Sequence, residues 1–125
     1  MELKLGVVES MFADIIWENE PITSGHLTKL CEEQLHWKRT TTYTVLRKLC
    51  DRGIFQNQKG VVSSILTKQE FYAIQGDGII EKGFEGSLPA FLAAFTKRNS
   101  LTKKEIREIR QFIDSMEDDD DVSDV

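Results

Sequence analysis

The spacing of apolar residues divides the first part of the chain into three expected helices. In residues 6–18, apolar side chains recur at the intervals of one face of an amphipathic helix. The inner face of this helix is expected to contain Val7, Val8, Met11, Phe12, Ile15 and Ile16. A second helix is expected over residues 23–34, beginning at a Thr-Ser pair that can cap it. A third is expected over residues 38–52, with Gly53 at the left-handed position that ends many helices.

Two β-prone segments follow, residues 54–58 and 61–66. Lys59-Gly60 lies between them and is typical of a hairpin turn. Three helices followed by a hairpin is the order of a winged helix-turn-helix, and the short connection between the second and third helices fits that motif.

After Thr67 the pattern predicts three more helices, at residues 68–84, 88–98 and 103–116. Ser87 and Thr102 are the expected N-caps of the last two, and Glu105 completes a capping box with Thr102. Two glycines at positions 76 and 78 predict a kink or break in the first, since each costs about 1 kcal/mol relative to Ala in a helix.

The last three helices carry more apolar surface than their own segment can cover. Pairing with a second copy would bury it, and a symmetric dimer is the commonest oligomer. The alternative is that these helices fold back on the amino-terminal domain. The expected interface residues are Phe84, Leu88, Phe91, Leu92, Phe95, Ile106, Ile109, Phe112 and Ile113.

These patterns predict a mainly α fold with a small β-hairpin. We expect a winged helix-turn-helix DNA-binding domain at residues 1–67, a helical dimerisation domain at 68–116 and an acidic disordered tail at 117–125. Apolar residues make up 40% and charged residues 30% of the chain, which is typical of a folded soluble protein. The longest apolar run, residues 88–95, is too short to span a membrane, and the first residues do not resemble an export signal. A cytoplasmic location without membrane insertion is therefore expected.

The net charge of −5 conceals two oppositely charged segments. Residues 36–60 contain six Lys and Arg residues against one Asp, whereas residues 114–125 contain seven acidic residues and no basic one. The local charge therefore favours a nucleic-acid partner for the third helix. The acidic end is interpreted as a solvated tail; the alternative is that it competes with DNA for the basic helix.

The third helix begins with a cluster of threonines and basic residues that suits the DNA major groove. A threonine hydroxyl can bond a base edge or phosphate, and its methyl group can contact thymine. The helix N-terminus adds partial positive charge. Helix capping with a solvated face is the alternative explanation. The expected DNA contacts are Lys38, Arg39, Thr40, Thr41, Tyr43, Thr44, Arg47, Lys48 and Lys59.

No catalytic or metal-binding pattern is evident, and neither a cofactor nor an enzymatic activity is expected. Cys31 and Cys50 lack metal-ligand spacing with each other or with the histidines, and we interpret them as small buried hydrophobic residues. His26 and His36 have no nucleophile or paired carboxylate beside them in the sequence. The rival to DNA binding is a winged-helix domain that binds protein.

The chain resembles the penicillinase-repressor family over about residues 5–114. The resemblance in the DNA-binding half rests on Glu9, Met11, Trp17, Trp37, Thr41, Thr44, Leu46, Leu49, Arg52-Gly53 and Lys59-Gly60. In the second half it rests on residues 84–88, Phe95, residues 101–106 and Ile109. The Gly60-Val61-Val62 wing lacks the Arg and the aromatic residue usual in the family, and the terminal cysteines of its copper-sensing branch are absent.

This resemblance implies a homodimeric repressor that binds a palindromic double-stranded operator through residues 38–52, with protomers interlocked by residues 84–113. In the β-lactam branch, a membrane sensor-protease system leads to cleavage in the dimerisation region. By similarity the scissile bond would fall near Ala94-Phe95. Simple helix packing also explains that pair, and we favour the packing explanation.

Overall fold

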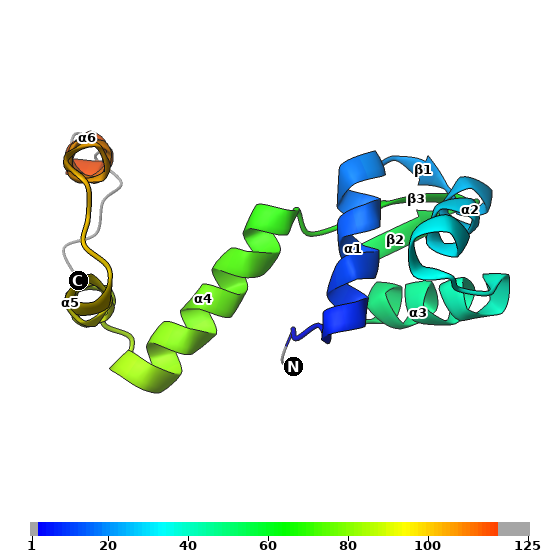
Figure 1. Cartoon of the computed structure of the whole chain (residues 1–125), viewed down its shortest axis with the longest axis horizontal. Coiled ribbons are helices and arrows are strands. Elements are labelled where there is room, and N and C mark those ends of the chain that lie inside the picture. The colour runs from blue at the N-terminus through cyan, green and yellow to red at the C-terminus, as the bar shows by residue number, and fades with distance from the viewer. Residues whose placement is uncertain (1–2, 118–125) are drawn as a thin grey trace. The chain divides into compact units, whose positions relative to one another are not determined.

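The computed structural model of the chain describes residues 3–117 (Figure 1). Its elements are α1 (Val7–Asn19), β1 (Ile22–Thr23), α2 (Ser24–Leu35), α3 (Arg39–Asp51), β2 (Phe55–Gln58), β3 (Val61–Ser64), α4 (Lys68–Phe84), α5 (Leu88–Arg98) and α6 (Lys103–Glu117). The chain divides into two compact units, and the boundary between them lies within α4, between Ile79 and Ile80. The functional domain boundaries expected at residues 67 and 116 stay a prediction. The expected acidic tail lies, apart from its first residue, outside the described residues.

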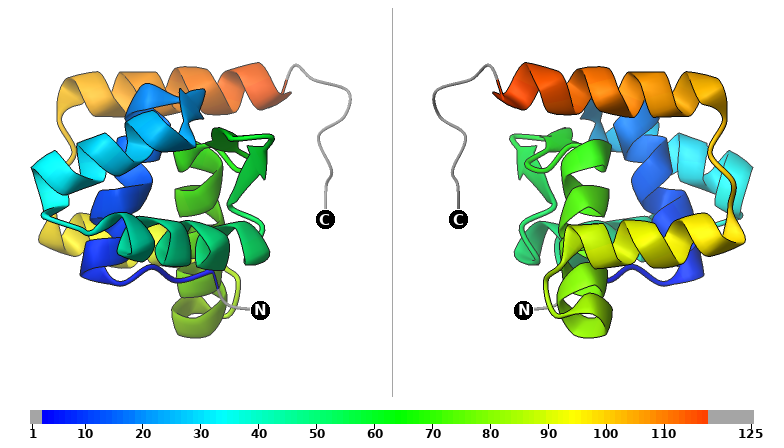
Figure 2. Two further views of the ribbon diagram at one scale, coloured as in Figure 1. Left: turned by 90° about the vertical axis from the view of Figure 1, so that its right-hand side faces the viewer. Right: turned by 90° about the vertical axis from the view of Figure 1, so that its left-hand side faces the viewer.

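The first unit has the predicted winged-helix order, with three helices followed by a hairpin. The hairpin strands β2 and β3 pair antiparallel, and β1 joins the other side of β3 through the pairs Ile22–Val62 and Thr23–Val61. Figure 2 shows the hairpin and the helices of this unit from two further directions. The sequence did not predict β1, because a two-residue strand carries no periodicity and its partner lies about 40 residues later.

The core of this unit comes from all three helices and the sheet. Its fully buried side chains are Phe12, Ala13, Ile16, Leu27, Cys31, Leu49, Ile54, Phe55 and Val62. The prediction for α1 is correct for Phe12, Ile15 and Ile16, which are buried. It is wrong for Val7, Val8 and Met11, which are exposed. The part of α1 that packs against the core begins at Phe12, so the residues of its first turn extend past the core into solvent.

The side chain of Trp17 connects α1 with the chain that follows the hairpin. Its indole nitrogen donates a hydrogen bond to the carbonyl oxygen of Leu66 at 3.0 Å. Its ring lies 5.3 Å from that of Phe55 and 5.7 Å from that of Phe71, measured between centroids. Since Phe71 is buried in α4, the first turns of α4 belong structurally to the winged-helix unit.

Helix α4 crosses from the first unit into the second without interruption. The break predicted at Gly76 and Gly78 is therefore wrong. A β-carbon placed at either position would meet no atom within 4 Å, so neither glycine is required by packing. The helix tolerates their lower helix propensity because the neighbouring residues continue its hydrogen-bond pattern.

The caps predicted for α5 and α6 are both confirmed. The Ser87 hydroxyl accepts from the Ala90 amide at 3.1 Å. Thr102 and Glu105 form a reciprocal capping box, with distances of 2.9 and 3.1 Å. Neither α5 nor α6, over residues 88–117, buries a side chain fully.

Two further features concern the chemistry expected from the composition. Cys31 is buried as predicted and Cys50 half-buried, and burial raises the pKa of both thiols. No helix within residues 3–117 is both long and apolar enough to cross a bilayer.

Candidate nucleic-acid interface

Helix α3 is anchored by one face and presents the other to solvent. Leu46 and Leu49 are buried, and Val45 and Cys50 are half-buried. On the opposite face Thr40, Thr44 and Arg47 are exposed at spacings of four and three residues, which aligns them along two helical turns. Buried leucines on one side therefore fix the direction in which these polar side chains point.

Three of the four clustered threonines are exposed. Thr40, Thr41 and Thr44 face solvent, whereas Thr42 is only 1% exposed and belongs to the core. The Thr44 hydroxyl donates to the carbonyl oxygen of Thr40 at 2.9 Å, which leaves its lone pairs and its methyl group free to face a ligand. Exposure leaves Thr40, Thr41 and Thr44 accessible to a ligand, and their predicted contact with DNA stays a prediction.

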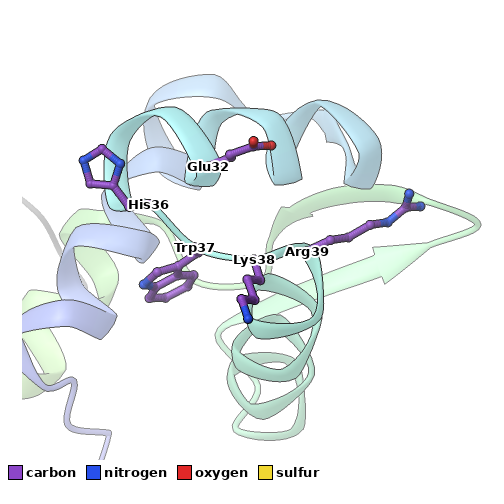
Figure 3. A pocket seen from close by; sticks show the side chains of 5 residues that line it. All are labelled: Glu32, His36, Trp37, Lys38 and Arg39. Carbon is purple, nitrogen blue, oxygen red and sulfur yellow. The ribbon is translucent and has the colours of Figure 1, made fainter.

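The N-terminus of α3 carries two exposed cations and no side-chain cap. Lys38 is the N-cap residue and makes no capping hydrogen bond, and Arg39 begins the helix. Both side chains line a shallow, open depression together with Glu32, His36 and Trp37 (Figure 3). The amide groups of the first turn therefore combine with these cations in a field that attracts phosphate.

Tyr43 extends from α3 towards α2. Its hydroxyl lies 3.2 Å from the hydroxyl of Ser24, and the Arg39 guanidinium lies over its ring, 5.7 Å from the centroid. The hydrogen bond with Ser24, followed by the one with Arg39, lowers the pKa of the phenol. The predicted contact residue is thus half-buried, with its hydroxyl engaged inside the protein.

Two basic side chains near the end of α3 turn towards α1. The ammonium of Lys48 lies 3.2 Å from one carboxylate oxygen of Glu9, and the guanidinium of Arg52 lies 3.8 Å from the other. The Gly6 amide donates a hydrogen bond to Glu9, and this bond, followed by the two cations, lowers the pKa of the carboxyl group. Sequence reasoning missed Glu9 as a partner because it precedes Lys48 by 39 residues.

The hairpin carries an exposed cation at its turn. Lys59 and Gly60 form its turn with φ values of 53° and 84°, the left-handed backbone expected of a two-residue hairpin loop. Lys59 is exposed at the tip, and the Asn57 side chain accepts from the Gly60 amide at 3.0 Å.

A groove separates α3 from β2. Its lining includes Tyr43, Arg47 and Asn57. Asn57 is a polar residue of this surface that the sequence did not single out, since its place beside α3 depends on the register of the hairpin. Residues 3–117 contain no group of three or more His, Cys, Asp or Glu side chains that could hold a metal ion.

The fold and this surface define a winged helix-turn-helix protein whose third helix is suited to duplex DNA. Residues 5–115 match the family model of the penicillinase repressors. The chain is also similar to the penicillinase repressor of Bacillus licheniformis, with 19% identity over 104 residues that cover 80% of this chain and 81% of that protein. The chain belongs to the penicillinase repressor family, and it is a DNA-binding regulator of transcription that acts as a repressor.

Proposed function

We propose that the protein represses transcription as a homodimer that binds a palindromic operator, with the N-terminal half of α3 in the major groove. The exposed face formed by Thr40, Thr44 and Arg47 is the observation that carries this proposal, because the buried face of the same helix holds it in place. Two winged helices held in a fixed geometry read two half-sites, which gives a specificity that one alone lacks.

The position of Asp51 indicates which half of α3 approaches the DNA. Asp51 is exposed at the last turn, four residues after Arg47 and on the same face. Its carboxylate repels phosphate, whereas the first turn carries Lys38, Arg39 and the positive end of the helix dipole. The proposed contacts are therefore Lys38, Arg39, Thr40, Thr41, Thr44 and Arg47, with Lys59 from the hairpin.

Exposed apolar residues on α5 and α6 support the homodimer. Seven of the predicted interface residues are exposed by 38–61% of their surface: Leu88, Leu92, Phe95, Ile106, Ile109, Phe112 and Ile113. Phe84 and Phe91 are half-buried, and their rings contact each other with centroids 5.5 Å apart. Burying such side chains is worth about 25 cal/mol per Å², so a second copy is the simplest cover for them.

Analytical ultracentrifugation tests the dimer. The wild-type protein is expected to sediment as a dimer at about 10 μM, because interfaces of standard size have dissociation constants between about micromolar and picomolar. Phe112→Asp places a charge at a residue that is 61% exposed in the single chain, so it is expected to produce monomers without unfolding the chain. A monomeric wild-type protein contradicts the proposal.

Selection of bound fragments from genomic DNA, followed by footprinting, tests the operator. The expected result is two inverted half-sites whose centres lie a whole number of helical turns apart, about 10 base pairs per turn. Protection of a single asymmetric site contradicts the palindromic arrangement.

A protein-binding winged helix is the second candidate. It requires a buried threonine surface or a dominant acidic face beside α3, whereas Thr40, Thr41 and Thr44 are exposed beside Lys38 and Arg39. A pull-down without DNA, compared with an electrophoretic shift on random-sequence DNA, separates the two functions.

Proteolytic relief of repression through a membrane sensor-protease system stays a prediction of the family resemblance. Ala94 and Phe95 lie in the middle of α5 (Leu88–Arg98), with Ala94 half-buried. Cleavage of a helical bond proceeds through local opening of the helix, so the rate of cutting would follow the stability of α5. Mass spectrometry of the protein after induction of the host cells would show fragments that end at Ala94; an intact chain contradicts the prediction.

A further inference from the structure

The hydroxyl of Tyr43 connects the recognition helix to α2. The partner of this hydroxyl is the Ser24 hydroxyl, at 3.2 Å, and Ser24 is the first residue of α2. The bond spans 19 residues of sequence and is partly buried, so it joins two separate elements rather than neighbouring turns of one helix. A tyrosine that was present only to contact DNA would need no such partner.

Ser24 has a second contact, on the side of the hairpin. Its backbone amide donates a hydrogen bond of 2.8 Å to the carbonyl oxygen of Gly60, the second residue of the hairpin turn. The preceding residue, Thr23, pairs with Val61 in the sheet. A β-carbon placed on Gly60 would lie 3.9 Å from the Ser24 hydroxyl oxygen, in ordinary van der Waals contact. Ser24 therefore lies between α3 and the turn that carries Lys59.

The ring of Tyr43 has a separate role at the start of α3. The guanidinium of Arg39 lies over this ring at 5.7 Å from the centroid, within the range of a cation–π contact. One aromatic side chain thus contacts an exposed cation with its ring and the first residue of α2 with its hydroxyl.

We propose that Tyr43 and Ser24 form a positioning pair that holds the hairpin turn in register with the recognition helix. Lys59 at the turn and Arg39 at the helix N-terminus then approach DNA in one fixed geometry. Tyr43 acts as a positioning residue and does not read a base with its hydroxyl. This inference rests on the proposed DNA-binding function of α3.

The pair can be tested with substitutions that remove single hydroxyl groups. Tyr43→Phe retains the ring under Arg39, and Ser24→Ala retains the backbone amide that donates to Gly60. Tyr72→Phe is the matched control, because Tyr72 is 46% exposed on α4 and lies outside this network. Fluorescence anisotropy measures the affinity of each variant for DNA. The labelled probe is a duplex of about 25 base pairs that contains the operator obtained by the genomic selection, or a random duplex at about 50 mM salt.

The two single variants are each expected to bind DNA about two- to fivefold more weakly, the upper value corresponding to one hydrogen bond of roughly 1 kcal/mol. The double variant is expected to be no weaker than either single one, since both substitutions remove the same bond. Lys59→Ala is expected to cost less affinity in the Tyr43→Phe background than in the wild type. Tyr72→Phe should leave affinity unchanged.

Other patterns contradict the inference. If Tyr43→Phe weakens binding and Ser24→Ala does not, the phenol hydroxyl contacts DNA directly. The proposed Tyr43–Ser24 pair is also overturned if the losses of affinity add in the double variant, or if both single variants and the double variant bind DNA as tightly as the wild type.

A measurement without DNA separates this inference from the proposed function. In ¹H–¹⁵N NMR spectra, Tyr43→Phe is expected to shift the amide resonances of Lys59 and Gly60, whereas Tyr72→Phe leaves them in place. Unmoved resonances overturn the positioning role even if the protein binds DNA. Failure of the wild-type protein to bind any duplex refutes the proposed function instead, and the NMR result still decides the pairing.

Discussion

Arg47 and Lys48 are adjacent in the sequence but have different electrostatic surroundings. Arg47 lies on the exposed face of α3 with Thr40 and Thr44. Lys48 turns towards α1, where its ammonium lies 3.2 Å from the carboxylate of Glu9. A lysine held by a carboxylate of its own protein must break or share that ion pair in order to bind a phosphate, so its contribution to DNA binding is smaller. We therefore predict that the two alanine substitutions affect DNA binding differently.

The magnitude follows from counterion release. Each phosphate neutralised on duplex DNA adds about 0.9 to the slope of log affinity against log salt, so two Arg47 side chains in a dimer contribute about 1.8. Between about 50 and 200 mM salt, this part of the slope weakens binding roughly 12-fold, a dependence that Arg47→Ala should remove. Lys48→Ala should leave the slope close to that of the wild type.

The assay is fluorescence anisotropy on the operator at four or five salt concentrations, with urea unfolding of each variant as a control for stability. Lys48 is 61% exposed, and Lys48→Ala removes a surface ion pair worth about 0.2–1 kcal/mol of stability. Equal changes of slope in the two variants, or a larger change for Lys48→Ala, would refute the assignment of Arg47 to the DNA-facing side.

Three further predictions concern stability and the site. The pKa of Glu9 is lowered in the folded protein, so the ionised carboxylate stabilises the fold fully above the ordinary value of 4.5, and this stabilisation is lost as pH falls below it. Glu9→Gln removes this titrating group. Thermal melts followed by circular dichroism should therefore show a smaller fall in Tm on acidification for Glu9→Gln than for the wild type. Gly78→Ala should raise the free energy of unfolding by about 1 kcal/mol in urea titrations, because a methyl group there meets no atom within 4 Å, and an unchanged or lower value contradicts this. Gly53→Ala should lower the free energy of unfolding by about 1–2 kcal/mol, since the φ of +79° at this position is unfavourable for alanine. Equal stability of Gly78→Ala and Gly53→Ala would contradict the different backbone roles given to the two glycines.

Local sequence patterns predicted much of the fold, because the signals are contained in a few consecutive residues. The Thr102–Glu105 capping box and the Lys59-Gly60 turn are examples, and both have the expected geometry. Strand β1 and the exposure of Val7 were not predictable in this way. Each depends on what lies opposite in the folded chain: Val61 and Val62 pair with β1, and the core ends before the first turn of α1.

The same distinction between local and distant information applies to the candidate site. Its residue types were evident from the cluster of threonines and cations, but the direction of each side chain was not. The structure turns Lys48 to Glu9, Tyr43 to Ser24 and Thr42 into the core. These partners lie 19 to 39 residues away along the chain or on the buried face, so helix periodicity alone does not identify them.

A comparison of two threonines tests most directly whether the exposed face of α3 binds the operator. Thr44 and Thr96 are both exposed helical threonines, and each donates its hydroxyl to the carbonyl oxygen four residues earlier, at 2.9 and 2.8 Å. In anisotropy titrations on the selected operator, Thr44→Ala is predicted to lose about 1–3 kcal/mol of binding free energy, while Thr96→Ala retains wild-type affinity. Wild-type operator affinity for Thr44→Ala, or an equal loss for both variants, would contradict the assignment of α3 as the DNA-reading helix.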